Sequence, residues 1–141
     1  FLVIGRDRQV QRYETATGQR LGTLTLPAVT TGDVAICPDP HKPWLAVITG
    51  RSVDLIDWQQ GRTIGSLHQP ARCGDIVWSG EWLAGAGPSG TINVWHLPSG
   101  KHHFIFGHRA PMLNLDFIPG TRVLVSTGVD GLIYYWDVAS G

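Results

Sequence analysis

The chain has 141 residues, and its eleven Lys and Arg balance eleven Asp and Glu, so the formal net charge is +0 with six His neutral. This balance argues against a general polyanion binder, which relies on excess basic charge, and no nucleic-acid partner is expected. Glycine (18) and proline (9) are frequent, whereas charged residues make up only 16% of the chain, against roughly 25% in ordinary globular domains. The composition predicts a folded, turn-rich protein.

The sequence indicates neither a disulfide scaffold nor a membrane helix. Cys37 and Cys73 lie far apart, without the spacing of a zinc knuckle, and are predicted to be buried thiols rather than a disulfide pair. The longest segment without charged residues, 82–100, is interrupted by glycine and proline, which argues against a membrane span. No signal peptide is visible, although this says little about a chain whose true N-terminus is expected to be missing. The expected location is cytoplasmic. Because the chain starts at Phe1 rather than Met and stops at Gly141 within a repeated pattern, we expect it to be a fragment.

One pattern occurs four times along the chain: a β-like stretch, an aromatic or apolar residue, four further residues and a glycine. The aromatic or apolar positions are Tyr13, Ile56, Trp95 and Trp136, which gives a period of about 41 residues, as in a β-propeller blade of four short strands.

Short runs of β-branched and aromatic residues between turn residues indicate strands, and no window carries the apolar stripe of a helix. The sequence therefore predicts an all-β protein without helices, in blade segments 1–25, 33–67, 75–106 and 107–141 with three, four, four and three strands. The predicted strands are 1–5, 9–13, 20–24, 33–37, 44–49, 52–56, 62–67, 75–78, 82–85, 91–95, 101–106, 113–117, 123–127 and 132–136. Six aromatic residues are expected in the core between blades: Trp78, Trp82, Trp95, Phe104, Phe106 and Phe117.

The last repeat carries a family resemblance. Gly107-His108, Ser126, the turn around Asp130 and Trp136-Asp137 resemble a repeat of the WD family, a likeness that is good in the third segment and weak in the first two. The resemblance implies a propeller, usually of seven blades, whose strands are named a to d from the axis outward. The first segment would then lack strand a and the last would lack strand d. The chain is thus expected to form three and a half to four blades, with the remaining blades of the same chain needed to close the ring.

Ser126, His108 and Asp130 have the composition of a nucleophilic triad. The resemblance instead implies a structural tetrad of these three residues with Trp136, in which buried polar groups satisfy one another and hold a loop and a turn on the blade. No catalytic residue is therefore assigned. In the other three segments, the position of Asp130 is occupied by Asp7, Gly50 and Ser89, and the position of Ser126 by Val3, Ala46 and Gly85. Because the tetrad is incomplete there, those blades are expected to rely on apolar packing.

Two further motifs suggest ligands but are better explained structurally. The glycines from Gly85 to Gly90 match a dinucleotide-binding pattern, but a strand rather than a helix follows, so a hairpin turn is predicted and no cofactor is expected. His102 and His103 are neighbours on a predicted strand, where their side chains point to opposite faces, and His108 belongs to the tetrad. With His96 they are not expected to bind a metal.

In a propeller, the d–a and b–c loops lie on one rim, the top, and the c–d loops on the other. The predicted strands put five arginines on the top rim, where their guanidinium groups suit carboxylate or phosphate contacts. We expect this rim to bind an acidic or phosphorylated peptide of a partner protein. The candidate rim arginines are Arg6, Arg8, Arg51, Arg72 and Arg109.

Trp44 and Trp58 lie near turns, where an exposed aromatic side chain could contact a partner. For Trp58, a position in the core and a position on the surface are equally compatible with the sequence.

The resemblance implies a non-catalytic protein-protein interaction scaffold. Two alternatives remain open at this point. The segment from Tyr13 to Leu21 also resembles the blade motif of quinoprotein dehydrogenase-like propellers, which would make the chain part of an enzyme. A sensor or regulatory domain fused to an effector such as a kinase is equally compatible with a propeller.

Overall fold

The structure is a computed structural model that describes residues 2–4, 9–26, 36–39, 42–48, 52–68 and 73–141. Within these ranges all regular structure is β-strand, and no helix is long and apolar enough to cross a membrane. In chain order the strands are β1 (Leu2–Ile4), β2 (Gln9–Tyr13), β3 (Arg20–Thr25), β4 (Ile36–Pro38), β5 (Trp44–Ile48), β6 (Ser52–Asp57), β7 (Arg62–His68), β8 (Asp75–Ser79), β9 (Trp82–Ala86), β10 (Thr91–His96), β11 (Lys101–Phe106), β12 (Met112–Phe117), β13 (Val123–Gly128) and β14 (Ile133–Asp137).

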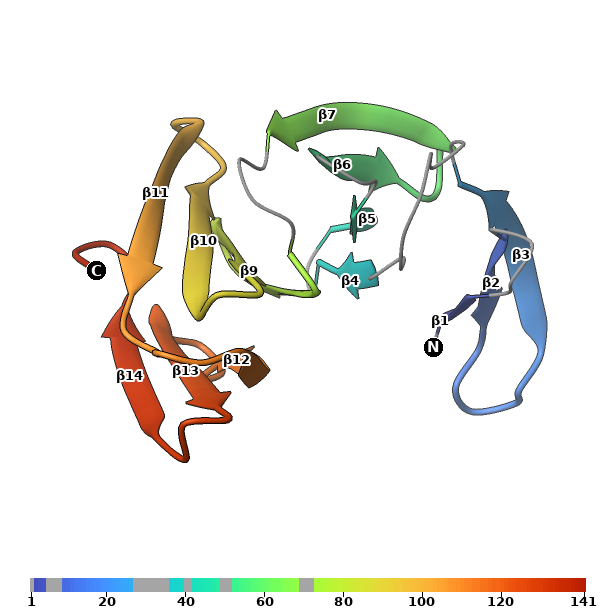
Figure 1. The fold of residues 1–141 in the computed structure, drawn as a ribbon. Helices are drawn as coiled ribbons and strands as arrows, with labels where there is room; N and C mark the ends of the chain where they lie inside the picture. The colour runs from blue at the N-terminus through green and yellow to red at the C-terminus, as the bar shows by residue number, and fades with distance from the viewer. Residues whose placement is uncertain (1, 5–8, 27–35, 40–41, 49–51, 69–72) are drawn as a thin grey trace.

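The strands form antiparallel sheets in which each strand pairs with its neighbour in sequence: β1-β2-β3, β4-β5-β6-β7, β8-β9-β10-β11 and β12-β13-β14. The predicted all-β fold and the order of three, four, four and three strands are confirmed. Wherever the flanking residues are described, the predicted and observed strand ends agree to within one residue. Figure 1 shows the four sheets following one another along an arc.

The glycine of each repeat has a conformational reason. Gly18, Gly61, Gly100 and Gly141 have φ angles of 69°, 66°, 65° and 76°, in the left-handed region that glycine enters without the steric cost of a Cβ atom. Three of them close the turns that join β2 to β3, β6 to β7 and β10 to β11. The glycine recurs in the sequence because the same turn geometry occurs in successive sheets.

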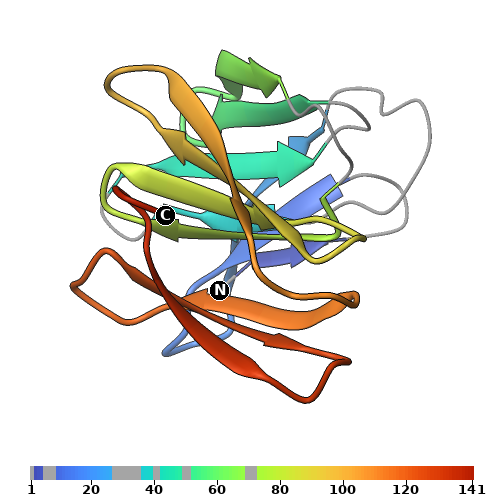
Figure 2. The ribbon, with the colours of Figure 1, turned by 60° about the vertical axis from the view of Figure 1, so that its left-hand side comes forward.

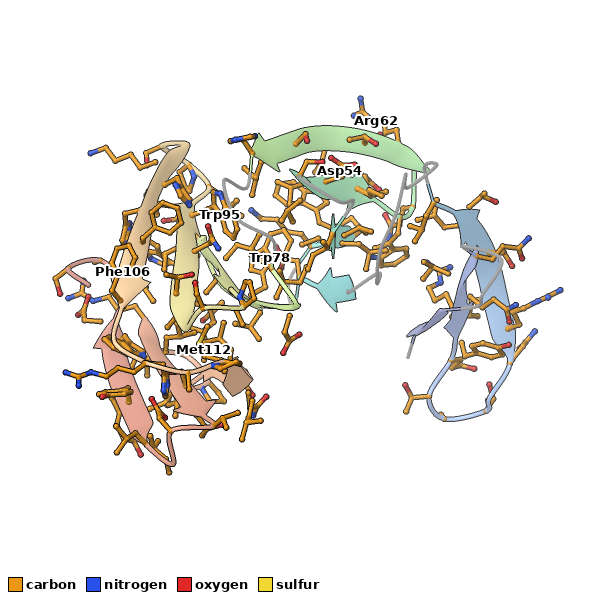
Figure 3. All side chains as sticks on the ribbon, in the orientation of Figure 1. Asp54, Arg62, Trp78, Trp95, Phe106 and Met112 are labelled. Atoms are coloured by element: carbon orange, nitrogen blue, oxygen red, sulfur yellow. The ribbon has the colours of Figure 1, made fainter. Side chains whose placement is uncertain are left out.

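Neighbouring sheets pack face to face through apolar clusters. One cluster joins Ile48 and Val53 of the second sheet to Trp78, Leu83 and Trp95 of the third, and Figure 3 shows the two tryptophans between these sheets. A second cluster lies between the third and fourth sheets, which Figure 2 shows side by side. A third joins the first sheet to the second. The second cluster comprises Ala84, Ile92, Val94, Ile105, Leu115, Phe117, Leu124 and Val138, and the third Val10, Leu26, Leu45, Val47 and Ile56.

Burial depends on the position of a strand within its sheet. The middle strands β5, β6, β9 and β10 are mostly buried, whereas the outer strands β3, β7 and β11 are mostly exposed or half-buried. The prediction that Phe106 belongs to the core is wrong, because this residue ends the outer strand β11 and is 71% exposed. At the inner side, β4 lies against β8, and β12 lies against β8 and β9.

Two leucines of β12 test this packing, because the sheet buries one and exposes the other. Leu115 is 1% exposed and packs in the cluster between the third and fourth sheets, whereas Leu113 is 70% exposed. Leu115→Ala should lower the free energy of unfolding by about 2–5 kcal/mol, because it removes buried methyl groups and leaves a cavity. Leu113→Ala should change it by less than about 0.5 kcal/mol. Urea unfolding of the 141-residue chain, in which Leu113 is exposed, measures both, and equal effects would contradict the packing.

Candidate functional site

The four tetrad residues come together at one end of the last sheet. His108 precedes β12, Ser126 lies on β13, Asp130 lies in the β13–β14 turn and Trp136 lies on β14. The indole Nε1–H of Trp136 donates to Ser126 Oγ over 2.8 Å, and His108 Nε2 lies 2.8 Å from the same oxygen. His108 Nδ1 lies 3.0 Å from each carboxylate oxygen of Asp130. One chain of hydrogen bonds thus links two strands, a loop and a turn.

One assignment of hydrogens satisfies the whole chain. If Nδ1 of His108 carries the proton and donates to Asp130, Nε2 accepts from the Ser126 hydroxyl, which in turn accepts from Trp136. Asp130 also accepts from the backbone N–H groups of Arg109 and Leu132, each over 3.2 Å. Desolvation raises the pKa of Asp130, but the hydrogen bonds from His108, Leu132 and Arg109 together hold it below its ordinary value of 3.8.

Two positions next to the tetrad side chains have space only for glycine. A Cβ atom on Gly107 would collide with the ring carbons of Trp136, and one on Gly128 would collide with His108 Nδ1 and Asp130 Oδ1. The ring of Tyr134 packs edge-on against His108, with the centroids 4.7 Å apart. The Gly-His pair in the sequence therefore reflects the close approach of the loop to Trp136.

The geometry of the tetrad is that of a buried hydrogen-bond network that holds a loop and a turn, rather than that of an accessible nucleophile. Ser126 is 0% exposed and His108 is 6% exposed, so a substrate in solution has no access to the hydroxyl. That hydroxyl is already engaged by both the indole and the imidazole. Outside this network, the described residues contain no group of three or more His, Cys, Asp or Glu able to hold a metal ion.

The third sheet contains a different polar network in the equivalent place. Asn93 Nδ2 donates to Cys73 Sγ over 3.2 Å, and Asn93 Oδ1 lies 3.2 Å from Nε2 of His102. Gly85 stands where the last sheet has Ser126, and a Cβ there would collide with Cys73 Sγ. Trp95 Nε1 donates instead to the backbone oxygen of His68 over 3.3 Å. The expectation that this blade relies on apolar packing alone is wrong.

Burial controls the ionisation of this second network. Desolvation raises the pKa of the Cys73 thiol to about 12, although the hydrogen bond from Asn93 acts in the opposite direction. Desolvation, followed by the nearby charges of His103 and His68, lowers the pKa of His102. The thiol and the imidazole are therefore both held neutral at physiological pH. The buried state predicted for Cys73 is confirmed, whereas the side chain of Cys37 lies outside the described part of the structure.

The first two sheets use other residues at these positions. In the second sheet, Ala46 and Ile56 occupy the places of Ser126 and Trp136 and are both buried in apolar clusters, as expected. Gly50 and Asp7 lie outside the described residues, as does the side chain of Val3. The segment from Gly85 to Gly90 is the predicted turn, since β10 follows it and Gly87 N–H donates to the backbone oxygen of Thr91 over 2.7 Å.

The structure describes only one of the five rim arginines. Arg109 is exposed, directly after His108, and its backbone N–H is held by Asp130. The other four, Arg6, Arg8, Arg51 and Arg72, lie outside the described residues.

Both tryptophans near turns are half-buried beneath a cation. Lys42 Nζ lies 4.2 Å from the ring centroid of Trp44, and Arg12 Cζ lies 4.5 Å from that of Trp58. Sequence reasoning did not find the pair of Arg12 and Trp58, because the two residues belong to different sheets and share no motif.

Comparison with known proteins identifies the class. Residues 100–137, which comprise β11 to β14, match the family described as WD domain, G-beta repeat. Among solved structures, U3-55K superposes with a TM-score of 0.78 at 13% identity and the RRP9 WD40 repeats with 0.79 at 14%, each covering 99% of this chain and 45% or 44% of theirs. These likenesses define the propeller fold.

Curated relatives agree with this class. WD repeat-containing protein SL1-17 of Schistosoma mansoni is 27% identical over 96% of this chain and 46% of its own length. COMPASS component SWD3 of Saccharomyces cerevisiae is 26% identical over 72% and 34%, and target of rapamycin complex subunit wat1 of Schizosaccharomyces pombe is 22% identical over 95% and 44%. The chain thus spans less than half the length of these relatives. The chain is therefore similar to WD-repeat proteins along most of its length, and the quinoprotein-like alternative is not favoured.

Removal of the central hydroxyl tests the tetrad. Ser126→Ala leaves the buried Trp136 N–H and His108 Nε2 without their shared partner, so the free energy of unfolding should fall by roughly 1–3 kcal/mol. The control is Ser140→Ala, the same substitution at an exposed serine after β14, which should be nearly neutral. Urea unfolding monitored by tryptophan fluorescence compares the two. Equal stability of the two variants would contradict the role of the tetrad.

Proposed function

We propose that the protein containing this chain is a non-catalytic interaction scaffold that binds other proteins on its propeller rim. The observation that carries the proposal is the tetrad, whose buried polar groups hold the loop before β12 and the β13–β14 turn in fixed positions. Support also comes from relatives whose names describe subunits of assemblies, a COMPASS component and a target of rapamycin complex subunit.

The scaffold function follows from how these loops are fixed. Asp130 accepts hydrogen bonds from the backbone of Arg109 and Leu132, and its partner His108 is buried. The loop and the turn are thus ordered during folding, so a partner that docks on them does not bear that entropic cost at binding.

The partner surface that we propose is the basic top rim. Arg109 is exposed, and Arg6, Arg8, Arg51 and Arg72 complete the set expected from the order of strands and loops. Guanidinium groups bind carboxylates and phosphates with two parallel hydrogen bonds, which favours an acidic or phosphorylated peptide. Because the chain has no net charge, the attraction would be local to this rim.

Charge reversal tests the proposal. Replacing Arg51, Arg72 and Arg109 with Glu in the tagged full-length protein should abolish most partner capture and its dependence on salt, because the rim then repels an acidic segment. The matched control reverses three exposed cations away from this rim, Arg20, Arg62 and Lys101, and should retain capture. Proteins captured from the native source are identified by mass spectrometry. If the wild type retains no partner, the scaffold function is wrong; if the rim variant retains the same partners, the rim assignment is wrong.

A further inference from the structure

A pocket lies between the first two sheets, away from the tetrad. It has a volume of about 460 Å³ and is formed by β2 and β3 together with the turn that follows β6. Arg12, Leu21, Leu24 and Trp58 are among its lining residues. The pocket is within the range of about 300–1,000 Å³ that is usual for ligand sites.

Arg12 has an unusual environment in this pocket. Its guanidinium carbon lies 4.5 Å from the centroid of the Trp58 ring, which holds the group by a cation–π contact. Gly22 is its cross-strand partner, so no side chain fills the space opposite Arg12 on β3. Val10, two residues earlier on the same face of β2, is buried in the cluster that joins the two sheets. The arginine is therefore positioned by packing at the junction of the sheets.

One hydrogen-bond donor of Arg12, its Nε, is not used within the described part of the chain. Its Nε is buried and has no hydrogen-bond partner there, and a buried donor without a partner is costly. None of the residues described as lining the pocket is acidic. Trp58 covers one face of the guanidinium group. The N–H donors point outward in the plane of that group, so Trp58 does not block them. The edge of a guanidinium group binds a carboxylate through two parallel hydrogen bonds.

Apolar side chains and a strand edge adjoin this cation. Leu21 is 48% exposed on β3, and Leu24 packs against the cluster between the sheets. β3 is the last strand of its sheet, so one of its edges has no strand partner among the described residues. An extended peptide can add to such an edge through its backbone while alternate side chains enter pockets beside it.

We propose that the pocket of Arg12 and Trp58 binds a glutamate or aspartate side chain of an extended peptide from a partner protein. The carboxylate lies on the edge of the Arg12 guanidinium, and the apolar residues flanking the acidic residue contact Leu21 and Leu24. The site rests on the scaffold function proposed above but is independent of the rim arginines. It gives the scaffold a second peptide-binding surface, at the junction of two sheets.

A peptide array tests this site on the full-length protein. Its members carry a central Glu flanked by varied apolar residues, and matched arrays carry Gln or phosphoserine at the centre. We expect members that depend on the Glu, and for these Arg12→Gln should weaken binding at least about tenfold by fluorescence polarisation, because the positive charge and the paired hydrogen bonds of the guanidinium to the carboxylate are lost. Arg12→Lys should retain only part of the affinity.

The control is Arg62→Gln, the same change at an exposed arginine on the outer strand β7, which Figure 3 shows on the outside of its sheet. This variant should bind as the wild type does. Trp58→Phe is a second variant, which keeps an aromatic face and should weaken binding by several-fold. Equal binding by Arg12→Gln and Arg62→Gln, equal binding of Glu and Gln peptides, or a tenfold preference for phosphoserine would each overturn the proposal. If one of these results is obtained while the full-length protein still captures partners through the rim, the pocket proposal is wrong but the scaffold function is not contradicted.

Discussion

Face-to-face packing of neighbouring sheets is the constraint on which the rest of this structure depends. A sheet between two others has no solvent-exposed face, so its middle strands must be apolar on both sides. This explains why β5 and β9 are buried along nearly their whole length rather than at alternate residues. The outer strands escape this constraint and carry exposed residues such as Arg62 and Lys101.

The polar groups at the sheet ends follow from the same constraint. The last sheet places His108, Ser126 and Trp136 at its end, whereas the third sheet has Gly85 in place of the serine and uses Cys73 and Asn93 there. The second sheet fills the same place with Ala46 and Ile56. Three sets of side chains therefore satisfy one geometry, and two of them do so with every central polar group hydrogen-bonded.

The sequence predicts the strands well because each depends on local signals. The glycine of each repeat requires a positive φ angle, and the strand ends are marked by turn residues on either side. The tetrad is predictable because its four residues keep the spacing of a known repeat. The tetrad supports the scaffold function, whereas the rim arginines rest on topology alone, since Arg109 is the described member of that set.

Contacts between sheets are beyond such reasoning. The network of Cys73, Asn93 and His102 joins residues without a characteristic spacing, and the pair of Arg12 and Trp58 joins different sheets. Phe106 shows the opposite error, because its type suggests the core while its position at the end of an outer strand exposes it. Composition shows what a strand can bury, but only the stacking of sheets decides which faces are covered.

Native-state hydrogen exchange of the full-length protein, followed by mass spectrometry, tests the central claim most directly. If face-to-face packing of the middle strands holds the sheets together, the amides of β5, β6, β9 and β10 should exchange slowest, and those of the outer strands β7 and β11 should exchange faster through local opening. Exchange at the same rate in middle and outer strands, or slower exchange in the outer ones, would contradict this account.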